Sequence, residues 1–173
     1  MATTLSEHQI HLRPARMEDI QILRYWDEQP HVQDSGSEDD WQWETEIKKQ
    51  YSWRELLLAE LDTRPIGFIQ IIDPALEETH YWGDVPDNLR AIDIWIGDAH
   101  NLGKGYGTIM MRLALERCFQ DPRVTAVLID PLMSNTRAHR FYERIGFEFV
   151  EQRVFGNDVC FVYRLDKDRF LSK

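Results

Sequence analysis

Three glycines alternate with other residues in the run 101–108, and this pattern is suited to binding a phosphate. Glycine lets backbone N–H groups turn inward and approach an anion closely. A helix that starts directly after such a turn adds the positive end of its dipole. The run follows a strand-like segment, residues 91–96, and precedes a helical one. We therefore interpret Gly103, Gly105 and Gly107 as part of a pyrophosphate site, with a tight strand-to-helix turn that binds nothing as the alternative.

A second segment, residues 134–147, predicts a short helix after the next strand along the chain. Ser134 or Asn135 can cap this helix, and Gly146 can end it in the left-handed conformation. Tyr142 lies on its apolar stripe. By spacing alone a tyrosine there belongs to the core.

Together the two segments resemble the acyl-CoA-binding motifs of the GCN5-related N-acetyltransferase (GNAT) superfamily. The resemblance covers residues 66–147. It implies an α/β fold with a mixed, mostly antiparallel sheet flanked by helices on both faces, and acetyl-CoA as co-substrate. The residues that we assign to acetyl-CoA are Trp95, Ile96, Gly103, Lys104, Gly105, Tyr106, Gly107, Thr108 and Asn135.

The glycine run departs from the usual GNAT loop at one position. That loop begins with Gln or Arg, and here Leu102 stands before Gly105 and Gly107. One side-chain contact is therefore missing, but backbone N–H donors suffice for an anion. Lys104 can add a point charge to the phosphates, or can be an ordinary solvated lysine.

Asp93 interrupts the apolar strand 91–96. An unpaired buried charge is costly, so an acid on a central strand either faces a solvated cleft or finds a partner. We interpret Asp93 as a catalytic carboxylate that binds an ammonium group and accepts its proton, directly or through water. The alternative is a structural aspartate that bonds to loop backbone. Asp130, which follows the strand 126–129, is a second candidate for the ammonium, or simply part of an Asp-Pro turn.

The resemblance also assigns roles on the helix after Asn135. It implies that Tyr142 is catalytic, its phenol donating a proton to the departing thiolate of CoA, and that Asn135 contacts the pantetheine arm. A phenol with a pKa of about 10 is a suitable acid for a thiolate. In the GNAT fold the strand 94–96 splays from its neighbour, so that a backbone N–H can polarise the thioester carbonyl.

Among GNAT families, the chain most resembles the aminoglycoside 6′-N-acetyltransferases. The words that carry this resemblance are Tyr81-Trp82, residues 91–93, residues 102–107, Asp121-Pro122, Asp130-Pro131, Ser134-Asn135 and residues 142–147. The resemblance implies that Tyr81, Trp82, Asp93 and Asp130 line an aminoglycoside pocket, with Asp93 as the base. An acidic, aromatic cleft also suits a polycationic sugar on physical grounds.

Two other readings share these motifs. A GNAT enzyme could acylate the amine or hydroxylamine of a siderophore precursor, or a protein N-terminus. A GNAT-shaped regulatory module could hold acyl-CoA without turnover, and loss of Tyr142 or of the acceptor acids would mark it. Neither is lost here.

Composition narrows the class of protein. The chain has 173 residues, 43% of them hydrophobic, which predicts a single domain over residues 1–173. Its net charge of −10 is uneven: residues 1–100 hold 21 acidic and 8 basic residues, and residues 101–173 hold 9 and 12. Such a field repels nucleic acid and attracts a polycation. The stretch 27–46 carries eight acids and no Lys or Arg, and can equally be a solvated surface.

We expect a protein without membrane segments, metal or disulfides, in the cytoplasm, as a monomer or homodimer with a small cationic amine as its partner. Cys118 and Cys160 look like small buried hydrophobes. The patterns predict strands at 10–14, 53–61, 66–72, 91–97, 126–129, 147–154 and 159–165. They predict helices at 17–28, 40–50, 105–120 and 135–145, a polar loop at 33–40 and a long acidic, aromatic loop at 73–90.

Overall fold

The centre of the fold is a seven-stranded sheet in the order β1-β2-β3-β4-β5-β7-β6. We describe it from a computed structural model, which describes residues 9–35 and 41–172. The strands are β1 (Ile10–Pro14), β2 (Arg54–Leu61), β3 (Arg64–Ile72), β4 (Leu89–Ile96), β5 (Ala126–Ile129), β6 (Glu148–Phe155) and β7 (Asp158–Asp166). Neighbouring strands are antiparallel except β4 and β5, which are parallel.

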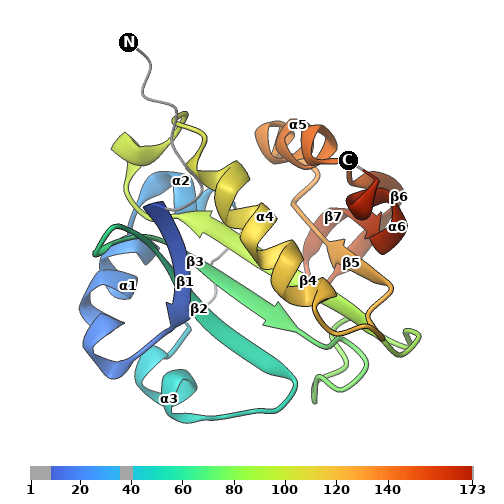
Figure 1. The fold of residues 1–173 in the computed structure, drawn as a ribbon, viewed down its shortest axis with the longest axis horizontal. Helices are drawn as coiled ribbons and strands as arrows, with labels where there is room; N and C mark the ends of the chain where they lie inside the picture. Colours follow the sequence, from blue (N-terminus) through green and yellow to red (C-terminus); the bar gives the residue numbers. More distant parts are fainter. Residues whose placement is uncertain (1–8, 36–40, 173) are drawn as a thin grey trace.

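Helices cover both faces of this sheet (Figure 1). Leu57 packs in the cluster that contains the α4 side chains, and the next residue, Leu58, packs with those of α1. Successive side chains of a strand point to opposite faces, so these clusters lie on opposite sides. The predicted fold class is confirmed. The helices are η2 (Met17–Asp19), α1 (Ile20–Asp27), α2 (Pro30–Gln33), α3 (Trp43–Lys48), η3 (Ala99–Asn101), α4 (Tyr106–Phe119), α5 (Thr136–Ile145) and α6 (Lys167–Leu171).

The only parallel pair among the described strands is also a short one. The pairing of β4 with β5 runs from Leu89 to Ala91 on β4, whereas β4 continues along β3 to Ile96. The strands therefore part after Ala91, as the GNAT resemblance implies. This parting leaves one edge of β4 open where the candidate site residues begin.

The elements differ from expectation mainly near the N-terminus. The expected loop 33–40 is wrong at its start, because Pro30 fixes the first turn of α2, which includes Gln33. The expected helix 40–50 is shorter, and its first residue lies outside the described residues. The short helix α6 was not predicted from the sequence.

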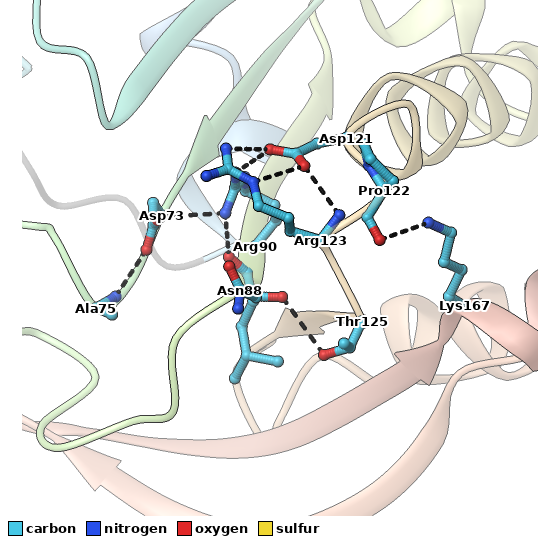
Figure 2. Close-up of polar contacts among 10 residues, drawn as sticks. Asp73, Ala75, Asn88, Arg90, Asp121, Pro122, Arg123, Thr125 and Lys167 are labelled. Carbon is cyan, nitrogen blue, oxygen red and sulfur yellow. Dashed lines mark hydrogen bonds and ion pairs between the residues drawn. The ribbon is translucent and has the colours of Figure 1, made fainter.

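An ion-pair network ties the start of β4 to two connections that cross the same end of the sheet (Figure 2). Arg90 contacts Asp73, directly after β3, at 3.1 Å and Asp121, directly after α4, at 3.6 Å. Arg123 contacts Asp121 at 2.9 Å. Arg90 therefore fixes both ends of the loop 73–88 and the approach to β5.

Both cysteines, Cys118 and Cys160, are buried and free, as expected. Within residues 9–35 and 41–172, no helix combines the length and the apolar character that crossing a membrane requires. The same part of the chain contains no cluster of His, Cys, Asp and Glu side chains that could hold a metal ion.

Candidate active site

A cleft of about 800 Å³ opens where β4 and β5 part. It is lined by residues 91–96 of β4, by residues 129–132 at the end of β5 and beyond it, by the glycine loop and by α5. The predicted site residues that line it are Tyr81, Trp82, Asp93, Trp95, Ile96, Gly103, Gly105, Gly107, Thr108, Asp130, Asn135 and Tyr142. The structure thus brings residues from five separate segments to one cavity.

The glycine loop forms the donor end of the cleft. Gly103 and Gly105 have φ values of +71° and +84°, which side-chain-bearing residues rarely adopt. A Cβ at either position would meet no atom within 4 Å, so the space beside the loop is open. Gly105 is the N-cap of α4, whose first N–H groups therefore lack a side-chain cap. These donors are available to an anion.

Two of the residues assigned to acetyl-CoA lie elsewhere. The Tyr106 side chain is buried in the core cluster beneath α4, so it can contribute only its backbone N–H. Lys104 is exposed and is not among the residues that line the cleft.

Asn135 caps α5, its side-chain oxygen accepting the N–H of Ala138 at 3.2 Å. Asn135 also lines the cleft.

His31 on α2 is a cleft residue that sequence reasoning missed. Its Nε2 bonds to the backbone oxygen of Ile96 at 2.8 Å, at the end of β4. α2 is thereby fixed against the strand that precedes the glycine loop. The contact joins residues 65 positions apart, so no local pattern could reveal it.

Asp93 lies partly buried in the middle of the cleft. Gln70 on β3 is its cross-strand neighbour, and the Gln70 Nε2 donates to Asp93 Oδ2 at 2.7 Å. The carboxylate therefore has a partner and faces the cleft as well. Gln70 was missed, although it interrupts the apolar strand β3 just as Asp93 interrupts β4.

Asp130 and Tyr81 form the second polar pair of the cleft. The Tyr81 hydroxyl donates to Asp130 Oδ2 at 2.6 Å, and the Tyr81 ring stacks on Phe155 at 4.6 Å. Burial, and next the charge of Asp93, raise the pKa of Asp130 to about 7. Trp82 is buried beside this pair, its ring edge-on to Phe155 at 5.2 Å.

Tyr142 is almost fully buried on α5 but reaches the cleft. Burial, followed by the charges of Asp93 and Asp130, raises the pKa of its phenol, which stays protonated at neutral pH. Tyr142, Asp93 and Asp130 line the same cleft. Gly146 ends α5 at a φ of +124°, as predicted.

Charges of both signs lie in or beside the cleft. Arg153 on β6 lies over the Phe155 ring at 4.8 Å and donates to the backbone oxygen of Trp82. Of the acidic stretch 27–46, Asp34 lines the cleft, while Glu46 is paired with Arg54 at 2.7 Å. The described acids of this stretch therefore serve partly as structure and partly as cleft lining.

The comparisons with known proteins identify the fold and its chemistry. Residues 15–155 match the acetyltransferase (GNAT) domain. The chain belongs to the GNAT acetyltransferase family. It is an acyl-CoA-dependent N-acetyltransferase, and acetyl-CoA is its co-substrate.

Two relatives and one solved structure show to which acetyltransferases the chain is similar. Aminoglycoside N(6′)-acetyltransferase type 1 of Klebsiella pneumoniae is 32% identical over 154 residues, which cover 84% of this chain and 77% of the relative. A kanamycin resistance protein of Rhizobium radiobacter is 45% identical over 74 residues, 42% of this chain and 68% of the relative. The crystal structure of aminoglycoside acetyltransferase AAC(6′)-Ib with coenzyme A and kanamycin superposes with a TM-score of 0.83 at 26% identity, covering 95% of this chain and 98% of that one.

A valine at Gly105 tests the donor end. Its side chain would occupy the open space beside the loop, so the dissociation constant of acetyl-CoA should rise at least about tenfold, or 1.4 kcal/mol, in isothermal titration calorimetry. Gly156→Val is the matched control, because Gly156 also has a positive φ and open surroundings but lies in the β6–β7 turn. Equal acetyl-CoA affinity in both folded variants would contradict this placement.

The raised pKa of Asp130 predicts a pH-dependent stability. The folded pKa of about 7 exceeds the ordinary value of 3.8, so the stability that this carboxyl contributes is full below pH 3.8 and is lost as pH rises through 7. Asp130→Asn carries no charge to bury. At pH 8 it should gain on the order of 1 kcal/mol relative to the parent in urea unfolding, beyond any difference at pH 5. The same difference at both pH values would refute the raised pKa.

Proposed function

We propose that the protein acetylates the 6′-amine of an aminoglycoside by direct transfer from acetyl-CoA within a ternary complex. The observation that carries this proposal is the single cleft, in which an anion-binding loop and a carboxylate pair share one cavity. The relatives named above, with aminoglycosides in their names, support the same substrate class.

The acceptor end suits a polycationic sugar. Asp93 and Asp130 can each pair with an ammonium group, and Asp34 and Asp158 add negative charge at the border of the cleft. The half-exposed ring of Tyr81 offers an apolar face to a sugar ring, and the buried Trp82 ring packs edge-on against it. A cation between Asp93 and Asp130 also relieves the repulsion between them.

Transfer needs a neutral amine, a polarised thioester carbonyl and a proton for the thiolate. In the proposed mechanism Asp93 accepts the ammonium proton, directly or through water, and the freed amine attacks the thioester carbon. A backbone N–H on the open edge of β4 stabilises the oxyanion. As the C–N bond forms and the C–S bond breaks, Tyr142 gives its proton to the departing thiolate. The attacking nitrogen then loses its second proton, which restores the Tyr142 phenol directly or through water.

The same proposal includes a location in the cytoplasm and a monomeric or homodimeric state. Both cysteines are free and buried, which fits the reducing cytoplasm. A small aminoglycoside needs only the cleft of one chain, so the proposed chemistry works in a monomer or in a homodimer.

Thiol release with two matched acceptors tests the proposal. Kanamycin should drive acetyl-CoA turnover, and an analogue with a hydroxyl in place of the 6′-amine should not. The reason is that a hydroxyl neither pairs with Asp93 nor attacks as readily as an amine. Equal turnover with both, or turnover only with a hydroxylamine or a peptide amine, would contradict the aminoglycoside assignment and leave the GNAT activity standing.

Tyr142→Phe tests the proposed acid. The ring keeps its packing and only the hydroxyl is lost, so kcat should fall roughly 100-fold, within the usual range for a general acid. Thermal unfolding should change little. If kcat is retained under conditions where chemistry limits turnover, Tyr142 is only a core residue.

A further inference from the structure

The loop of residues 73–88 joins β3 to β4 and carries Tyr81 to the cleft. Long connections without a helix or strand are uncommon in compact domains. The base of this one is fixed, because the Asp73 backbone oxygen accepts the N–H groups of Leu76 and Glu77, and Arg90 holds the Asp73 carboxylate (Figure 2). The middle of the loop needs stabilising contacts of its own.

Glu77 is a buried carboxylate inside this loop, with 7% of the residue exposed. Its Oε1 accepts the N–H of Thr79 at 2.7 Å, and its Oε2 accepts the Thr79 hydroxyl and the N–H of Tyr81, both at 2.9 Å. Burial alone would raise the pKa of Glu77, but the donors on Tyr81 and Thr79 outweigh it and lower the pKa. Glu77 is therefore ionised, and its carboxylate oxygens accept hydrogen bonds mainly from residues of its own loop.

Tyr81 is consequently fixed at three points. Its backbone N–H bonds to Glu77, its ring stacks on Phe155 with the two planes 9° apart, and its hydroxyl donates to Asp130. The residue is nevertheless 47% exposed, and it lines the cleft. Without the contact to Glu77, the exposed tyrosine would depend on the other two contacts alone.

We propose that Glu77 is a positioning residue of the acceptor site: it holds the Tyr81 backbone so that the phenol reaches Asp130 and the ring forms a wall of the pocket. This inference rests on the proposed function, since the pocket that Glu77 shapes is the acceptor pocket. Glu77 acts through Tyr81, because its own oxygens are already engaged by Thr79 and Tyr81.

A pair of variants separates positioning from general charge. Glu77→Gln keeps the size of the side chain but replaces one acceptor oxygen by a donor that faces N–H groups. Its KM for kanamycin should rise about tenfold, with the KM for acetyl-CoA changed less than about twofold. Glu78→Gln removes the same charge from the exposed neighbouring residue and should leave both values unchanged. A rise no larger than that in Glu78→Gln, or an equal rise for acetyl-CoA, would overturn the inference.

Coupling to Tyr81 provides a second readout. In a Tyr81→Ala background there is no side chain to position, so Glu77→Gln should raise the kanamycin KM by less than about twofold further. If the two substitutions instead multiply their separate effects, Glu77 does not act through Tyr81.

Hydrogen exchange tests whether Glu77 stabilises the loop, and it needs no amine substrate. The amides of Thr79 and Tyr81 should be protected in the unmodified protein and in Glu78→Gln, and should exchange faster in Glu77→Gln. Unprotected amides in the unmodified protein would overturn the inference, whichever amine the enzyme acetylates. Protected amides together with no aminoglycoside turnover would contradict the proposed function and leave the role of Glu77 in the loop standing.

Discussion

The parting of β4 from β5 after Ala91 is the constraint on which the rest of the site depends. Backbone groups along an open strand edge need hydrogen-bond partners, and an extended chain with amide groups, such as pantetheine, can supply them. His31 occupies the last backbone oxygen of the strand, at Ile96. The same gap exposes Asp93 on one strand and Asp130 beyond the end of the other. Donor and acceptor chemistry therefore meet where the sheet opens.

The electrostatics of the cleft select for a cation. Burial first, and then the charge of Asp93, raises the pKa of Asp130, and burial followed by the charges of Asp93 and Asp130 raises the pKa of Tyr142. The negative charges in the cavity therefore add to the effect of burial. An ammonium group would stabilise both carboxylates, whereas a neutral ligand would leave their repulsion in place. At the donor end, the uncapped start of α4 favours an anion. The cleft thus favours positive charge at one end and negative charge at the other.

Periodicity and turn residues were enough to predict the strands and the two helices that frame the site, whereas the mixed sheet was expected from the GNAT resemblance. The strand 126–129 and the end of α5 at Gly146 match the structure. α2 was missed because four residues are too few for a periodic pattern. Asp93 could be predicted as a site residue because a charged side chain on an apolar strand needs either a solvated cleft or a partner. Their partners depend on long-range pairing: Gln70 lies 23 positions from Asp93, and Tyr81 lies 49 from Asp130.

The proposed catalytic role of Asp93 is best tested with the variant Asp93→Asn and kanamycin as acceptor. Asparagine is nearly isosteric and can still accept from Gln70, but it can neither hold a full ammonium charge nor take its proton. We expect kcat/KM to fall by about two orders of magnitude, or 2.7 kcal/mol, with acetyl-CoA affinity and thermal unfolding close to those of the parent. A folded variant that keeps the parental kcat/KM would show that Asp93 does not receive the amine.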